Sequence, residues 1–180
     1  MHIKKNIGLA SIVLIVFLVL LSGCVENETA TDNEQTESVD WRDVELTDVR
    51  TGEVFRISDF EGPILVESFA VWCPTCLQQQ KEMKKLIETE GETITHISLD
   101  TDPNEDVDAV LDHVQRNDLD WYFAVAPTEM TEDMIDEFGV EVVNAPIAPV
   151  ILICEDGEAR LLGRGLKSAD ELNDEVAEGC

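Results

Sequence analysis

The apolar positions divide the chain into three parts. Residues 7–21 form one apolar run without a charge, and residues 25–38 are almost entirely polar. From residue 39 onward, apolar residues recur in short blocks that are separated by Gly, Pro and Asp. Only this last part can bury enough apolar surface to fold. We therefore expect one domain over residues 39–180, preceded by a flexible tether.

The first half of this domain predicts a hairpin followed by a strand, a helix and a strand. Apolar and polar residues alternate over 41–49 and 53–57 around a turn at Gly52, as in a β-hairpin. Apolar runs predict strands at 64–71 and 93–100, and the residues between them, 77–87, predict a helix. A helix that connects two strands in this way places them side by side and parallel.

The second half predicts further helices and an antiparallel pair of strands. We expect a helix over 102–117 with Val107 on its apolar face, and a short helix over 131–138 that begins at a Thr131 cap. The remaining expected elements are an extended stretch at 121–125, strands at 150–154 and 159–163, and a closing helix from a Ser168 cap to about residue 177.

The motif Trp72-Cys73-Pro74-Thr75-Cys76 lies between the predicted strand and helix of the first half. A cysteine at the first turn of a helix lies next to unpaired backbone N–H groups and the positive end of the helix dipole, which both favour the thiolate. Pro74 suits the first helical position, where its missing N–H costs nothing. Cys76 follows Cys73 by three residues and can form a disulfide with it. The motif predicts dithiol redox chemistry.

Two other interpretations of the cysteine pair are weaker. A zinc site needs two more ligands, and the sequence contains no second C-x-x-C and no H-x-x-x-H. A purely structural disulfide would close a loop of only three residues and would stabilise little. We therefore expect neither a metal nor a cofactor, and we expect the Cys73–Cys76 pair itself to be the redox group.

The N-terminal residues have the form of an export signal. Lys4 and Lys5 precede the apolar run, which ends in Leu-Ser-Gly-Cys24 and resembles the cleavage box of lipoproteins. We expect a signal peptide over 1–23, a lipidated Cys24, and an acidic tether over 24–38. An uncleaved signal anchor is the alternative, because the run is only slightly shorter than the roughly 20 residues that span a bilayer. Both interpretations place the domain at the outer face of the cytoplasmic membrane.

The charge is strongly negative, with 39 acidic residues against 12 Lys and Arg and a formal net charge of −27. Such a surface repels nucleic acid and anionic lipid, so we exclude these as binding partners. It also repels itself, and salt would screen that repulsion. We interpret the composition as halophilic, with an acidic periplasm or a basic partner as alternatives.

The domain resembles the membrane-tethered thioredoxin-fold proteins of the TlpA, ResA and CcmG type over nearly all of residues 41–177. The resemblance depends on the hairpin, the WCPTC motif, residues 98–102 with the helix after them, residues 138–140, and a proline eight residues before the Gly of a turn. It implies an α/β, thioredoxin-like three-layer fold, in which helices flank a central mixed sheet after an N-terminal β-hairpin. We also expect a monomer.

The resemblance implies further site residues. The family places a cis-proline opposite the disulfide, and the distance to Gly157 favours Pro149 over Pro146 for this position. The cis peptide would leave the backbone of Ala148, the preceding residue, free to pair with an extended cysteine peptide. Together with Trp72, Pro74 and Thr75, Ala148 and Pro149 would bind the substrate.

The family also places an acid, often Asp, six residues before the nucleophilic cysteine. This position is Glu67, whose carboxyl would lie below the disulfide with a raised pKa suited to moving the proton of Cys76. The alternative is a Glu67 that points outward at a strand edge. We expect His96 and His113 to be structural or solvated.

The expected function is extracytoplasmic thiol-disulfide exchange, in which Cys73 attacks a substrate disulfide and Cys76 releases the product. The resemblance implies exported cysteine-containing substrates, with apocytochrome c as one case, and a membrane thiol carrier of the CcdA or DsbD kind as reductant. A disulfide-forming oxidase and a redox-silent binding protein are the alternatives. For Cys154 and Cys180, a disulfide and two free thiols both remain open.

Overall fold

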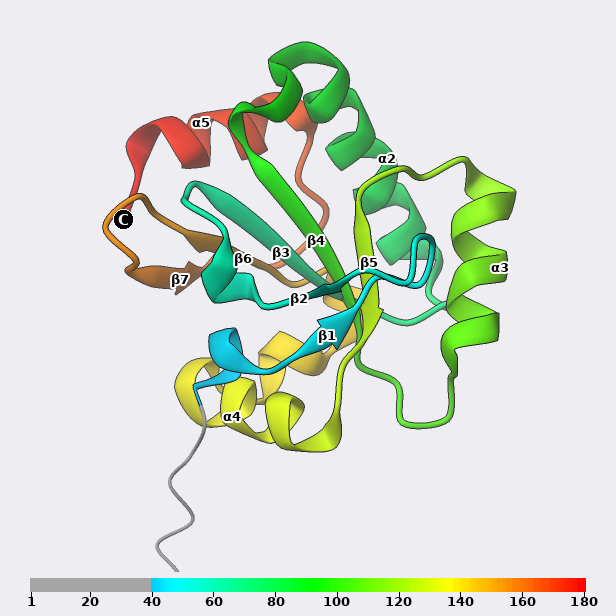
Figure 1. Ribbon diagram of the computed structural model, residues 1–180. Coiled ribbons are helices and arrows are strands. Elements are labelled where there is room, and N and C mark those ends of the chain that lie inside the picture. The colour runs from blue at the N-terminus through cyan, green and yellow to red at the C-terminus, as the bar shows by residue number, and fades with distance from the viewer. Residues whose placement is uncertain (1–39) are drawn as a thin grey trace, which may run out of the picture. The chain divides into compact units, whose positions relative to one another are not determined.

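A five-stranded sheet forms the centre of the domain in the computed structural model, which describes residues 40–180 (Figure 1). The strand order is β5-β4-β3-β6-β7. The central strand β3 (Ile64–Phe69) is parallel to β4 (Thr95–Asp100) and antiparallel to β6 (Val150–Ile153). At the edges, β5 (Tyr122–Val125) is parallel to β4, and β7 (Ala159–Leu161) is antiparallel to β6. The mixed sheet and the parallel β3–β4 pair agree with the sequence prediction.

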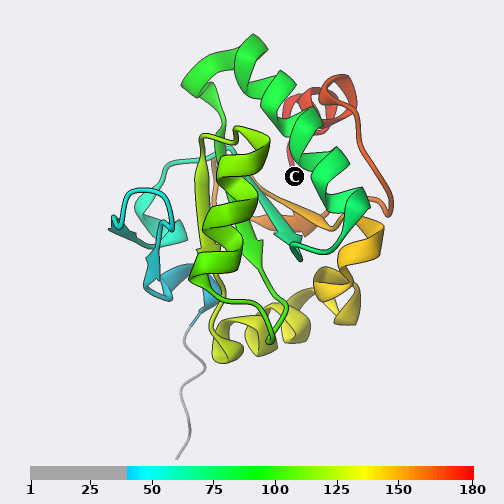
Figure 2. The same cartoon turned by 90° about the vertical axis from the view of Figure 1, so that its right-hand side faces the viewer.

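Helices cover both faces of this sheet (Figures 1 and 2). The helices α2 (Pro74–Glu90), α3 (Val107–Asn117) and α5 (Ala169–Glu178) contribute buried side chains to one apolar cluster, and α4 (Thr128–Phe138) and the N-terminal hairpin contribute to the other. The predicted three-layer, thioredoxin-like arrangement is therefore confirmed. In residues 40–180 no helix is both long and apolar enough to cross a membrane.

The alternation along β3 determines which face of the sheet Glu67 occupies. Leu65 and Phe69 belong to the cluster under α2, whereas Ile64 and Val66 belong to the cluster on the other face. Because successive side chains of a strand point to opposite faces, Glu67 lies on the α2 face with Leu65 and Phe69.

The N-terminal hairpin is shorter than its pattern predicts. Its strands are β1 (Leu46–Thr47) and β2 (Val54–Phe55), and Gly52 adopts a φ of 75° in the turn between them. Residues Trp41–Asp43 form a 3-10 helix instead of a strand. The cause is a tertiary contact, since the backbone N–H and indole Nε1 of Trp41 donate hydrogen bonds to Asp133 and Glu137 of α4.

Two helices begin at other residues than the sequence predicts. The carboxylate of Asp106 caps α3 by accepting the Ala109 N–H at 2.9 Å, so α3 begins at residue 107 and Val107 is exposed rather than on an apolar face. Thr131 is not a cap, because α4 already begins at Thr128. The Ser168 cap of α5 is confirmed: its side chain accepts the Glu171 N–H.

Cys154 and Cys180 form a disulfide, with their Cα atoms 6.0 Å apart. Cys154 follows Ile153, which pairs with Ile64 at the start of β3, whereas the WCPTC motif follows the other end of β3. The bridge therefore ties the C-terminus to the end of the sheet that lies away from the motif. Of the two alternatives that the sequence left open, the structure contains the disulfide. The predicted signal peptide, Cys24 and tether lie outside the described residues.

Candidate active site

The Cys73–Cys76 pair lies at the N-terminus of α2, directly after the central strand. Cys73 is the N-cap residue of α2, and Pro74 occupies a first-turn position. The two cysteines form a disulfide with their Cα atoms 5.4 Å apart, and Cys73 Sγ also accepts the Cys76 backbone N–H at 3.2 Å. That N–H and the positive end of the helix dipole would stabilise a thiolate on Cys73 after reduction.

Only one of these two cysteines lines a surface cleft, although both residues are buried, with 2% of Cys73 and 1% of Cys76 exposed. The cleft has a volume of about 360 Å³, and Cys73 lines it, whereas Cys76 does not. Cys76 Sγ instead lies 3.1 Å from the carbonyl oxygen of Ala145. The other residues lining the cleft are Val71, Trp72, Pro74, Leu77, His113, Arg116 and Asn117. Cys73 is therefore the sulfur that a substrate in this cleft would meet first.

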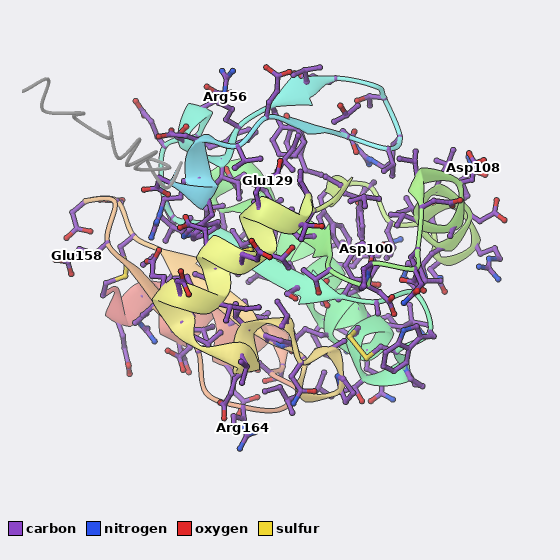
Figure 3. All side chains as sticks on the ribbon, turned by 90° about the horizontal axis from the view of Figure 1, so that it is seen from below. Arg56, Asp100, Asp108, Glu129, Glu158 and Arg164 are labelled. Carbon is purple, nitrogen blue, oxygen red and sulfur yellow. A yellow bond between two sulfur atoms is a disulfide. The ribbon has the colours of Figure 1, made fainter. Side chains whose placement is uncertain are left out.

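The segment after β4 holds the active-site loop in place. The exposed indole of Trp72 donates its Nε1–H to Asp102 at 2.6 Å, which lowers the pKa of that carboxyl, and the Val71 N–H donates to Glu105 at 2.6 Å. Asp100, labelled in Figure 3, pairs with Phe69 at the end of β3 that leads into the motif. Burial, with a smaller contribution from Glu105, raises the pKa of Asp100 to about 7. Carboxyl groups thus position both Trp72 and the backbone just before Cys73.

Glu67 is fully buried beneath α2. The Ser98 hydroxyl donates to Glu67 Oε2 at 2.8 Å, and the Trp121 indole in turn donates to the Ser98 oxygen at 3.0 Å. Burial raises the pKa of Glu67 to about 8, against the opposing effects of Ser98, the Gln80 amide and the Lys167 ammonium. The outward-facing alternative for Glu67 is wrong, because β3 is the central strand and the side chain is completely covered.

A buried lysine shares this region with Glu67. Lys167 Nζ donates to the carbonyl oxygens of Gly165 at 2.7 Å and Ala148 at 3.3 Å. The Gln79 side chain bonds to both the N–H and the carbonyl of Lys167 and so fixes its backbone against α2. Burial lowers the pKa of Lys167. Lys167 was not predicted as a site residue, because no pattern in the sequence around it marks it as buried.

The expectation of a cis-proline at position 149 is wrong. In residues 40–180 the cis peptide bond is Gly62–Pro63, so the bond before Pro149 is trans. The backbone of Ala148 is not free either, since its N–H donates to Ala145 and its carbonyl accepts from Lys167. The cause is the 3-10 turn over Ala145–Ile147. Ala148 ends this turn in the left-handed region at a φ of 49°, and its N–H bonds back to the carbonyl oxygen of Ala145.

The segment beside the cysteine pair is therefore the one around Pro146. Ala145 places its carbonyl oxygen at Cys76, and Pro146 is exposed, whereas Ala148 and Pro149 are buried. Thr75 is half-buried within the motif. The exposed surface around the disulfide thus includes Trp72, Pro74 and Pro146 rather than Ala148 and Pro149.

Both histidines of the domain are buried, but only His113 belongs to the site. Within residues 40–180 His96 has no hydrogen-bond partner, and burial lowers its pKa to about 4. His113 stacks on Phe69, lies 2.7 Å from the Gln80 side-chain oxygen and lines the Cys73 cleft. The sequence did contain a signal for its burial, because Val110, His113 and Val114 share one face of a helix at spacings of three and four.

The described part of the chain contains no group of three or more His, Cys, Asp or Glu side chains placed to hold a metal ion. The chemistry available at the site is that of two buried sulfurs at a helix N-terminus, one of them in a residue that lines a cleft, with a buried carboxyl group of raised pKa on the sheet face under the same helix. This arrangement suits thiol-disulfide exchange with transfer of one proton.

The fold is that of thioredoxin-like proteins, and comparison with solved structures supports this. A secreted Mycobacterium tuberculosis disulfide oxidoreductase, described as homologous to E. coli DsbE, aligns with a TM-score of 0.61 at 17% identity over 77% of this chain and 97% of its own. A thiol:disulfide interchange protein from Chlorobium tepidum gives 0.60 at 19% identity, covering 76% and 92% of the two chains.

A thioredoxin-related protein from Neisseria meningitidis gives a TM-score of 0.61 at 13% identity, covering 74% of this chain and 97% of its own. At these identities the likeness is one of fold. No protein-family model matches the chain. Comparison with curated proteins gives no significant match.

Proposed function

We propose that this chain is a membrane-anchored, extracytoplasmic thiol-disulfide oxidoreductase of the TlpA, ResA and CcmG type, which reduces disulfides in exported proteins. The observation that carries the proposal is the Cys73–Cys76 disulfide at the start of α2, with Cys73 alone of the pair lining the cleft. The structurally similar proteins, which include a secreted disulfide oxidoreductase and a thiol:disulfide interchange protein, support the same activity.

The reaction begins with the Cys73 thiolate. It attacks one sulfur of a substrate disulfide, the substrate S–S bond breaks, and the departing substrate sulfur leaves as a thiolate. Cys76 then gives its proton to the Glu67 carboxylate and attacks Cys73 Sγ. The second substrate thiolate leaves, and Cys73 and Cys76 are oxidised to the disulfide. A membrane thiol carrier of the CcdA or DsbD kind would reduce this disulfide again.

The surroundings of Cys73 support the proposed reducing direction of electron flow. The N–H of Cys76 and the dipole of α2 stabilise its thiolate, but Thr75 between the cysteines provides no positive charge. Strong oxidants depend on a much more stabilised thiolate. The pair should therefore act as a reductant. Apocytochromes c, whose haem-attachment cysteines must be reduced before haem is joined, form one class of substrate that this activity would serve.

The location is proposed from the sequence of residues 1–38. The charged start, the apolar run and Cys24 together suit export followed by lipid attachment at the outer face of the cytoplasmic membrane. The uncleaved segment is the alternative anchor.

Reduction of insulin by dithiothreitol tests the proposed activity. The wild-type chain should accelerate it, and Cys73→Ser should not. Cys180→Ser is the matched control, because it removes a cysteine at the other end of the sheet and should leave the rate unchanged. If the wild-type chain gives no acceleration, the redox-silent binding protein is the better interpretation.

A further inference from the structure

Three consecutive glutamines on α2 lie in three different environments. Gln78 is exposed, whereas Gln79 and Gln80 are completely buried. Gln79 bonds to the backbone of Lys167. Gln80 lies between Glu67 of β3 and His113 of α3. Because Gln80 follows Cys76 by four residues, the two share one face of α2 and are separated by about one helical turn.

His113 fixes the orientation of the Gln80 amide. The Gln80 Oε1 atom can only accept, so the His113 Nε2 atom at 2.7 Å must carry the hydrogen of this bond. His113 Nδ1 is then an acceptor, and it faces the Asn117 side-chain amide at 3.5 Å. With Oε1 engaged by His113, the Nε2 amide hydrogens of Gln80 are directed away from α3. They can therefore donate a hydrogen bond to a second acceptor on the side of α2 that faces the sheet.

The acceptor on that side is Glu67. Gln80 Nε2 and Glu67 Oε1 are both buried, and in the described structure neither makes a hydrogen bond of ordinary geometry, although Gln80 lies near enough to Glu67 to lower the pKa of its carboxyl. One atom is a donor and the other is an acceptor, so they complement each other only when Glu67 Oε1 carries no proton. Glu67 Oε2 already accepts the Ser98 hydrogen bond. The polar groups on both sides of Glu67 therefore suit its carboxylate form.

Building on the proposed function, we propose that Gln80, oriented by His113, is a positioning residue that stabilises the carboxylate form of Glu67 and so determines the pH above which Glu67 accepts the Cys76 proton. Leaving a buried carboxylate oxygen without a donor is costly, and a hydrogen bond to a charged group is stronger than one between neutral groups. Closure of Gln80 Nε2 onto Glu67 Oε1 would supply the missing donor as Glu67 ionises.

The other groups that face Glu67 act in the same direction or are neutral. On the neighbouring strands these are Ser98 of β4 and Val150 of β6, and neither is charged. The segment before α5 contributes the Lys167 ammonium, whose charge favours the Glu67 carboxylate and whose Nζ is bonded to backbone carbonyls. Gln80 is thus the uncharged neighbour of Glu67 that still has an unused donor in the described structure.

The test uses the purified full chain and follows Glu67 directly. The infrared absorption of the protonated Glu67 carboxyl, assigned by its loss in Glu67→Gln, is recorded from pH 5 to pH 10. Gln80→Met keeps the side-chain length and removes the amide. Its Glu67 midpoint should rise by about one to two pH units relative to wild type, as expected for loss of a hydrogen bond to a charged group. Gln78→Met on the exposed face is the control and should leave the midpoint unchanged.

A second variant covers the case in which Gln80→Met does not fold. His113→Phe retains a ring to stack on Phe69 but loses the Nε2–H that orients Gln80, so the midpoint should shift in the same direction. Wild-type midpoints in the folded variants would overturn the inference. The release of the mixed disulfide, measured separately in single turnovers, should show the same shift in its pH profile. A shifted infrared midpoint without any turnover would uphold the role of Gln80 and reject the proposed reduction, so the two failures are distinguishable.

Discussion

Cys73 and Cys76 have the same chemistry, and the environments of the two sulfurs give them different roles. Cys73 Sγ accepts a backbone N–H and lines the cleft, whereas Cys76 Sγ faces the Ala145 carbonyl. Cys73→Ser should therefore abolish turnover, because no thiolate remains at the cleft. Cys76→Ser should instead accumulate a mixed disulfide between Cys73 and substrate, visible as a mass increase on non-reducing analysis. Faster alkylation of Cys76 than of Cys73 in the reduced wild type would reverse the assignment.

Glu67 makes the stability of the domain depend on pH. The ordinary pKa of a glutamate is 4.5 and burial raises that of Glu67 to about 8, so between these values the native state holds a proton that the unfolded state releases. Stability should therefore fall as the pH rises through this range. Glu67→Gln removes this effect and should stabilise the protein by up to a few kcal/mol at pH 8, with little change at pH 5.

Urea unfolding at pH 5, 6.5 and 8 measures this difference. Asp100, whose pKa is also raised, will leave a residual slope of the same sign in Glu67→Gln. Glu88→Gln is a matched control on the exposed surface of α2. Equal stability changes for the two variants at pH 8 would show that burial of Glu67 carries no such cost.

Glu67→Gln should also slow the resolving step more than the alkylation of Cys73, because only the first needs the base.

At the scale of elements, the sequence predicted the helices and strands that are defined by a local hydrophobic pattern, a helix-start motif or a capping residue. The strand β3, the helix α2 and the Ser168 cap of α5 are examples, because a buried run, a helix-start motif and a capping residue are readable without any knowledge of the fold. The 3-10 helix at Trp41 was missed because hydrogen bonds to α4, more than 90 residues away, override the local alternation.

The candidate site was likewise predictable only where a short stretch of sequence defines it. The positions of Cys73 and Cys76 follow from the motif, and Glu67 was expected from the family resemblance together with the strand before the motif. The orientation of Gln80 and the burial of Lys167 depend on α3 and on the segment before α5, which no short pattern connects to the motif. The cis peptide bond expected before Pro149 came from the resemblance alone. In the structure this bond is trans, and it follows the 3-10 turn over Ala145–Ile147.

The Cys154–Cys180 bridge joins the end of β6 to the chain after α5, across 26 residues. A loop of this size should contribute roughly 3 kcal/mol by restricting the unfolded chain. Cys180→Ser breaks the bridge at its exposed end without opening a cavity in the core, and it should lower the melting temperature measurably. The insulin-reduction rate at a temperature where both proteins are folded should not change. An unaltered melting temperature would mean that the bridge contributes nothing to stability.

At the scale of the whole molecule, acidic residues outnumber basic ones by 39 to 12, so most carboxylates have no cation to pair with. Ion pairs such as Arg42–Glu137 and Arg160–Glu175 occupy part of the available positive charge. The remaining repulsion between exposed carboxylates should be screened by salt. If the composition is halophilic, the melting temperature should rise steeply as NaCl increases from low to molar concentration. A melting temperature that stays constant over this range would contradict the halophilic interpretation.

The central claim is that Cys73 and Cys76 form a reducing dithiol, and a redox titration tests it most directly. The full chain is equilibrated in thiol-disulfide buffers of graded potential and alkylated, and the labelled cysteines are counted by mass spectrometry. We predict that Cys73 and Cys76 become labelled together in one two-electron transition, at a potential nearer about −270 mV than −120 mV. A potential above about −180 mV would change the assignment from reductase to oxidase. A Cys73–Cys76 pair that does not exchange with the buffer at any potential would contradict the account.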